Sequence, residues 1–111
     1  MNILLDTHAL LWAISGQGLS ETARAAFFDV ENNLYFSAAS YWEICIKISI
    51  GKLKLPLGWE SVIDEFFLIN DIHWLAIAKE HSRAIIDLPM LHRDPFDRLL
   101  IAQAKCENMA L

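Results

Sequence analysis

Near its beginning the chain reads Asn2-Ile3-Leu4-Leu5-Asp6-Thr7. Its apolar residues do not alternate with polar ones, which is typical of a parallel strand covered on both faces. We predict a strand over residues 2–5, so Asp6 lies at its carboxyl end. In open α/β sheets, ligands bind at this edge. A carboxylate at this position therefore indicates a functional site.

Strands and helices are predicted to alternate along the rest of the chain. Further strands are expected at residues 34–36 and 72–75, and residues 109–111 are expected to begin one more. Helices are expected after Thr7 and after Ser20, then over about 40–50, 59–68, 78–86 and 94–107. This alternation predicts a parallel sheet with helices on both faces. Right-handed crossovers would bring every strand-to-helix junction to the same edge of the sheet.

The composition is that of one small domain. The chain has 111 residues, which suits a single domain over 1–111 with one hydrophobic core. Its hydrophobic fraction is 55%, so part of the apolar surface is expected to be buried against a partner, which predicts a homodimer. Neither a membrane span, which needs about 20 apolar residues, nor a signal peptide is predicted. Cys45 and Cys106 are expected to be small buried side chains in a reducing cytoplasm.

The net charge of −5 argues against a broad basic face for gripping a phosphate backbone. A nuclease is still compatible with this charge, because carboxylates that hold a metal count as negative until the metal binds. The lysines Lys47, Lys52 and Lys54 form a local basic patch, although Lys47 also suits a helical ion pair with Glu43.

Two predicted helix starts carry further acids. If Ser40 caps its helix, Glu43 is the third residue and the two form a capping box. Asp94 is likewise a natural cap, with Pro95 in the first helical position and Asp97 in the third. Capping alone therefore explains each of these acids.

Asp6 differs from these acids, because Thr7 is able to cap the helix that follows it. Carboxylates that converge on one cleft repel one another unless a cation neutralises them. Mg²⁺ or Mn²⁺ suits a site made only of oxygens. Such a metal generates hydroxide from water and stabilises charge on a transferring phosphate. The convergence of the acids therefore predicts phosphodiester hydrolysis.

Three segments carry a resemblance to a known family. They are Asp6-Thr7-His8-Ala9-Leu10-Leu11-Trp12; Ser37-Ala38-Ala39-Ser40-Tyr41-Trp42-Glu43-Ile44 with Lys47 and Gly51-Lys52-Leu53; and the stretch from His92 to Ala104. In this order, over nearly the whole chain, they resemble PIN-domain proteins, and most closely the VapC-type toxins of bacterial toxin–antitoxin pairs. The resemblance implies a three-layer α/β/α sandwich with a central parallel sheet whose last strand is incomplete.

The resemblance also implies an activity and its residues. It implies a Mg²⁺- or Mn²⁺-dependent endoribonuclease that is usually dimeric and is inhibited by a cognate antitoxin protein. Asp6, Glu43 and Asp97 match the family's first three metal-site acids, which makes them the expected catalytic and metal-binding residues. Asp94, one helical turn away, is a further candidate ligand, although its capping role comes first. Weaker candidates for contact with the RNA substrate are Thr7, Lys47 and Arg98.

Other hypotheses stay open. Family members normally continue past the point matching Leu111 into a strand and a Thr-x-Asp element that supplies a further acid. The second hypothesis is therefore a truncated, catalytically disabled domain that serves only as an antitoxin-binding or oligomerisation module. The third is a phosphohydrolase with Asp6 as nucleophile, but such enzymes usually carry a second Asp where this chain has His8.

Several aromatic and histidine residues have two interpretations. The tryptophans Trp12, Trp42, Trp59 and Trp74 have the chemistry to stack on RNA bases, but we expect them to fill the core or a subunit interface. His92 precedes the acidic turn, where packing within the loop is expected more than contact with substrate.

Overall fold

The computed structural model describes residues 1–89 and 94–111, so His92 lies outside the described residues. In the described part, the parallel strands lie in the order β1-β2-β3 and comprise β1 (Asn2–Leu5), β2 (Asn33–Ser37) and β3 (His73–Leu75). The helices are α1 (Thr7–Ser15), α2 (Glu21–Phe28), α3 (Ala38–Ser49), α4 (Trp59–Asn70), α5 (Lys79–Ala84) and α6 (Pro95–Cys106), and η1 (Ile85–Asp87) is a short 3₁₀ turn. The predicted α/β fold is confirmed.

The chain returns to the sheet after α6. The Leu4 amide donates a hydrogen bond to the carbonyl of Ala110 at 2.7 Å, and the Ala110 amide donates to the carbonyl of Asn2 at 2.9 Å. Ala110 thereby forms a parallel bridge with Ile3 on the outer edge of β1. The strand expected to begin at residues 109–111 is present as this single bridge.

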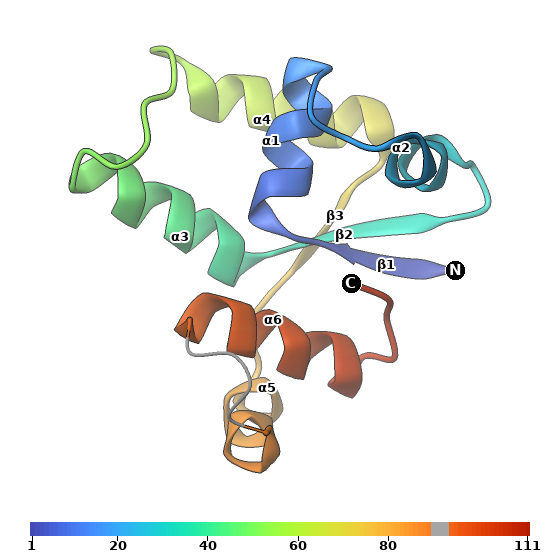
Figure 1. The fold of residues 1–111 in the computed structure, drawn as a ribbon, viewed down its shortest axis with the longest axis vertical. Helices are drawn as coiled ribbons and strands as arrows, with labels where there is room; N and C mark the ends of the chain where they lie inside the picture. Colours follow the sequence, from blue (N-terminus) through green and yellow to red (C-terminus); the bar gives the residue numbers. More distant parts are fainter. Residues whose placement is uncertain (90–93) are drawn as a thin grey trace.

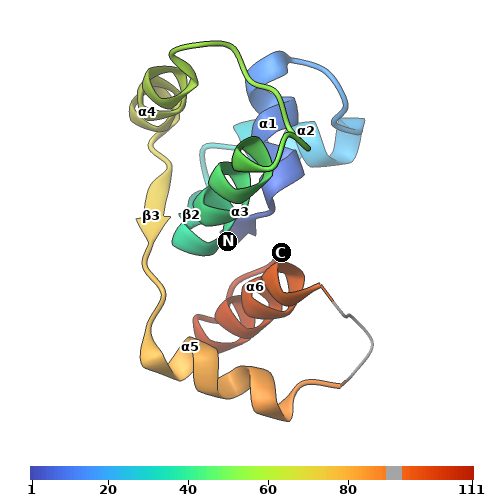
Figure 2. The same cartoon turned by 90° about the vertical axis from the view of Figure 1, so that its left-hand side faces the viewer.

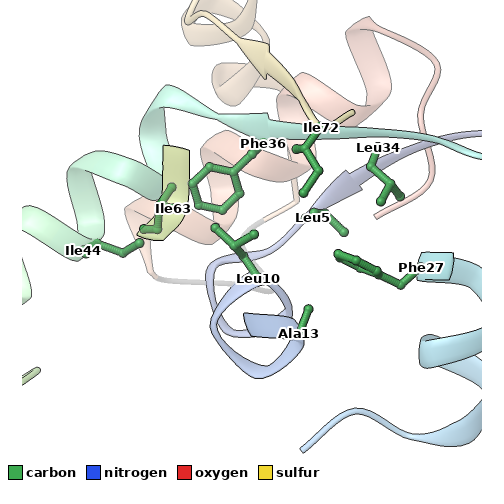
Figure 3. Close-up of a cluster of buried hydrophobic side chains, with 9 residues drawn as sticks. All are labelled: Leu5, Leu10, Ala13, Phe27, Leu34, Phe36, Ile44, Ile63 and Ile72. Atoms are coloured by element: carbon green, nitrogen blue, oxygen red, sulfur yellow. The ribbon is translucent and has the colours of Figure 1, made fainter. Parts of the chain in front are cut away.

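The sheet is covered on both faces, as Figures 1 and 2 show: α1, α2 and α4 lie on one face, and α5 and α6 lie on the other. The larger core, drawn in Figure 3, joins the first face to its helices and includes Leu5, Leu10 and Phe36. The second core joins Leu4 of β1 to Leu100 of α6. Neighbouring residues of β1 thus serve opposite cores, which is why its apolar run shows no alternation.

Two helices begin at residues other than those predicted. The cap of α1 is Asp6, whose carboxylate accepts a hydrogen bond from the Ala9 amide at 2.6 Å, so the prediction of Thr7 as cap was wrong. The cap of α3 is Ser37, whose hydroxyl accepts from the Ala39 amide at 2.9 Å. In both places the helix begins directly after the strand, so the last extended residue supplies the cap. The predicted capping box between Ser40 and Glu43 was therefore wrong.

The predicted burial of the two cysteines was wrong, and three of the four tryptophans lie outside the core, which leaves a subunit interface as their predicted place. Cys45 and Cys106 are exposed, and three tryptophans keep about half of their surface in solvent: Trp12 at 44%, Trp42 at 57% and Trp74 at 52%. Only Trp59 is packed against the larger core. Among the described residues, no helix combines the length and apolar character needed to cross a bilayer.

Candidate active site

The site is built on the carboxyl edge of the sheet, where β1 passes into α1. Asp6 is exposed there, and its Oδ1 accepts the hydrogen bond from the first turn of α1. The capping role leaves the carboxylate at the end of the strand, since a cap residue keeps extended backbone angles. Asp6 therefore stabilises α1 and presents a charge at the sheet edge at the same time.

Glu43 is a buried carboxylate with a partner for each oxygen. It is only 5% exposed, and its Oε1 accepts a hydrogen bond from the Thr7 hydroxyl at 2.7 Å. Its Oε2 accepts from the Lys47 ammonium, also at 2.7 Å, which is the predicted helical ion pair. The hydrogen bond to Glu43 is the main cause of a raised pKa at Lys47. A buried charge is stable only when it is paired in this way.

The amino-terminal end of α6 lies beside α3. Asp94 caps α6 by accepting hydrogen bonds from the amides of Phe96 at 2.8 Å and Asp97 at 3.3 Å, as predicted. The rings of Phe96 and Trp42 meet edge to face with their centroids 5.4 Å apart, which joins the two helices directly. The charges of Asp94 and Asp97 also contribute to the raised pKa of Lys47. Acids from α6 therefore act on the same lysine as Glu43 of α3.

Asp6 and Asp97 line one cavity of about 370 Å³, together with Leu100, Ile101 and Leu111. The structure thus brings the first and the third predicted acids to one hollow. Glu43 is joined to the same place through Thr7, the residue that follows Asp6.

Asp6, Glu43 and Asp97 do not form a cluster that could bind one metal ion in this structure. Among the described residues, no group of three His, Cys, Asp or Glu side chains lies near enough together to hold a metal ion. Both oxygens of Glu43 accept hydrogen bonds, one from Thr7 and the other from Lys47. The donor atoms fit Mg²⁺ or Mn²⁺, since both ions prefer carboxylate oxygens. Asp6 and Asp97 are the two of these acids that line the same cavity.

The weaker candidates have distinct surroundings. Thr7 is 5% exposed and its hydroxyl is directed to Glu43. The Lys47 side chain is 36% exposed, which leaves part of it open to solvent. The guanidinium of Arg98 donates hydrogen bonds to the carbonyls of Ile85 and Pro89, both at 3.0 Å, and so ties α6 to the segment before it.

A buried polar network, which the sequence did not suggest, holds α6 in place. Gln103 is fully buried and accepts a hydrogen bond from the Ser37 hydroxyl at 2.5 Å. Its amide nitrogen lies 3.3 Å from Nδ1 of the buried His81 and donates weakly to the carbonyl of Ala76 at 3.4 Å. The available signal was a single amide among the apolar residues of α6. The network fixes α6, and with it Asp97, against the ends of β2 and β3.

The fold and the site define a small α/β domain with acids gathered at the carboxyl edge of a parallel sheet. The family model described as PIN domain matches residues 3–111, so the chain belongs to the PIN-domain family, whose members are generally nucleases. The predicted family is thereby confirmed.

One solved structure with the same fold is a crystal structure of VapBC2 from Rickettsia felis bound to a DNA fragment from their promoter. The match has a TM-score of 0.72 at 18% sequence identity, and it covers 98% of this chain and 84% of that one. At this identity the likeness demonstrates a shared fold. The curated proteins gave no match.

Proposed function

We propose that the chain is a Mg²⁺- or Mn²⁺-dependent endoribonuclease and the toxin of a VapC-type toxin–antitoxin pair that acts in the cytoplasm. The observation that carries the proposal is the shared cavity of Asp6 and Asp97, with Glu43 joined to it through Thr7. Membership of a nuclease family supports the reaction class. The likeness to VapBC2 supports an antitoxin as the protein partner.

In this proposal the chain's residues have separate roles. Asp6 and Asp97 would hold the divalent cation, with Glu43 as the third acid. When bound, the cation lowers the pKa of a water molecule and neutralises charge on the phosphate. Thr7 keeps the Glu43 carboxylate oriented through its 2.7 Å hydrogen bond. The partly exposed Lys47 neutralises Glu43 and offers an ammonium group to the RNA backbone.

Cleavage of a single-stranded RNA in Mg²⁺ tests the proposal. We expect Asp6→Asn and Asp97→Asn each to lower the cleavage rate by at least about 100-fold, since each removes a charge from the metal site. Removal of Mg²⁺ with EDTA should abolish cleavage in the wild-type protein. Cleavage that persists in EDTA, or that Asp6→Asn does not diminish, would refute the proposal.

Asp71→Asn is the matched control for these substitutions. Asp71 is exposed and ends α4 with a φ of 51°, a left-handed conformation that asparagine also adopts readily. It precedes β3 and therefore lies at the opposite edge of the sheet from Asp6. This variant loses the same charge as Asp6→Asn, and we expect it to cleave RNA at the wild-type rate.

The second candidate function is a catalytically disabled module that only binds an antitoxin or a second copy. It is favoured by one observation, namely that Glu43 points to Lys47 and no three acids in the described part of the chain meet around one ion. The same assay separates the two functions. A disabled module would show no cleavage above the EDTA background, while still forming a dimer or a complex in sedimentation.

A further inference from the structure

An aromatic pair joins α3 and α6, the two helices that carry Glu43 and Asp97. Trp42 immediately precedes Glu43 on α3, and Phe96 immediately precedes Asp97 on α6. Their ring centroids lie 5.4 Å apart with an interplanar angle of 74°, an edge-to-face contact. Each ring therefore belongs to the residue that directly precedes, along the chain, an acid assigned to the metal site.

The indole of Trp42 is open to solvent. Its exposed fraction is 57%, whereas Phe96 is partly buried beneath the contact. An edge-to-face pair fixes the orientation of a ring while covering only part of it. Trp42 is thus a large, oriented aromatic surface that the protein's own core does not use.

Charged groups of both signs lie on the two helices that carry the pair, which distinguishes this surface from an apolar protein interface. Lys47 lies on the same helix as Trp42, and its side chain is 36% exposed. The charges of Asp94 and Asp97 contribute to the raised pKa of its ammonium group. Proteins that bind single-stranded nucleic acids combine basic side chains for the backbone with aromatic rings for the bases. Carboxylates beside the pair would repel an RNA backbone unless a cation lay between them, as the proposed function requires.

We propose that Trp42, held in place by Phe96, stacks on a nucleobase of single-stranded RNA next to the phosphate at the acidic site. This inference rests on the proposed function and adds a contact to a base. Stacking tolerates any base, since every base has a π-face, so Trp42 would contribute affinity and position more than sequence preference.

Fluorescence anisotropy with labelled single-stranded RNA tests the inference. The RNA is centred on the bond that the wild-type protein cleaves, and all proteins carry Asp6→Asn so that binding in Mg²⁺ is measured without cleavage. We expect Trp42→Ala to weaken binding by about 5- to 100-fold, the effect of losing one stacked base. Trp42→Phe, which keeps a ring, should lose clearly less. Phe96→Leu should fall between the two because the indole loses its support.

Abasic RNA identifies stacking itself. Removing the base at one position beside the cleaved bond should weaken binding to the Asp6→Asn protein. When the protein also carries Trp42→Ala, the RNA with and the RNA without this base should bind equally well. Trp74→Ala is the matched control, since Trp74 is 52% exposed on β3 and also rests edge to face on an aromatic ring, Tyr41, at 5.7 Å. Trp74→Ala should bind within about twofold of its parent, as is usual for surface substitutions.

Other outcomes would overturn the inference in distinguishable ways. If the wild-type protein cleaves RNA in Mg²⁺ but the Trp42 variants bind as well as their parent, the stacking role fails and the proposed function stands. If Trp42→Ala instead converts a dimer to a monomer in sedimentation with RNA affinity unchanged, the pair belongs to a protein interface. If the wild-type protein neither binds nor cleaves RNA, both proposals fail. Thermal melting by circular dichroism checks folding, and Trp42→Phe decides the question if Trp42→Ala is unfolded.

Discussion

At the scale of single residues, the hydrogen bond from Thr7 to Glu43 explains how a carboxyl group is accommodated inside the domain. Glu43 is 5% exposed, and a carboxylate buried to this extent needs partners for its oxygens. Thr7 is available because Asp6 supplies the cap of α1, which leaves the threonine hydroxyl free of that role. Because Asp6 caps α1, Thr7 donates its hydroxyl to Glu43 instead, and this hydrogen bond orients the Glu43 carboxyl group.

Replacing Thr7 by valine tests this role. Valine has the shape of threonine but no hydroxyl, so Thr7→Val should cost about 1.5–3 kcal/mol of unfolding free energy, the range for a hydrogen bond to a charged group. RNA cleavage should fall as well, because Glu43 loses the group that orients it. Thr7→Ser keeps the hydroxyl and is the control. Urea denaturation measures the stability, and a Thr7→Val protein as stable as the wild type would contradict this account.

Ser37 and Ser40 form a second matched pair, since both are fully buried. The Ser37 hydroxyl caps α3 and donates to Gln103, whereas the Ser40 hydroxyl has no hydrogen-bond partner within the described part of the chain. Ser37→Ala should therefore cost about 2 kcal/mol, because it removes a cap and leaves the Gln103 oxygen buried and unpaired. Ser40→Ala should change stability by less than about 0.5 kcal/mol, since no bond is lost. Equal losses in urea denaturation would show that the Ser37 bonds contribute nothing.

At the scale of elements, the position of α6 decides whether the site exists. Its beginning is capped by Asp94, its middle is held by Leu100 in the second core, and Gln103 ties it to the end of β2. Asp97 lies in the first turn, so any fraying of that turn moves a site residue. The cap and the buried network thus stabilise the geometry of the site as well as the helix.

Substitutions of Asp94 separate its capping role from metal binding. Serine caps helices as well as aspartate does, so Asp94→Ser should keep wild-type stability, while Asp94→Ala should lose about 1 kcal/mol in urea denaturation. Cleavage by Asp94→Ser then reports on charge alone. If it falls as far as in Asp97→Asn, Asp94 is a metal ligand as well as a cap.

At the scale of the whole molecule, the exposed apolar surface is large for a chain of 111 residues. Val30, Leu68 and Ile69 expose 94%, 84% and 71% of their surface. Extensive apolar surface in a small domain marks a site of association. The structure thus identifies exposed apolar side chains that belong to the high hydrophobic fraction of the chain.

We therefore expect a homodimer, the assembly predicted from composition. Sedimentation at micromolar concentration should give about twice the mass of one chain. A stable dimer interface buries about 1,600 Å² in total, and the exposed apolar side chains would contribute to it. Only monomer under these conditions would contradict the prediction. Added salt should have little effect on the mass if burial of apolar surface drives association.

Much of the fold was predictable because its signals are local. The apolar run of β1 predicted a strand covered on both faces, and Ser20 and Asp94 were correctly predicted as caps. These features depend on neighbours within a few residues along the chain. The predictions failed for Thr7 and Ser40 as caps, because the end of a strand is set by its pairing partner in another segment.

The sequence by itself determined the order of the elements, the family and the residue types available for metal chemistry. Only the tertiary structure decided that Asp6 and Asp97 share a cavity, that Glu43 is hydrogen-bonded to Thr7 and Lys47, and that Trp42 is exposed to solvent. The physical reason is that backbone patterns are short-range, whereas burial and side-chain partners depend on how distant elements pack. The residues next to Glu43 along the chain, for example, do not reveal that its carboxylate accepts a hydrogen bond from the Thr7 hydroxyl.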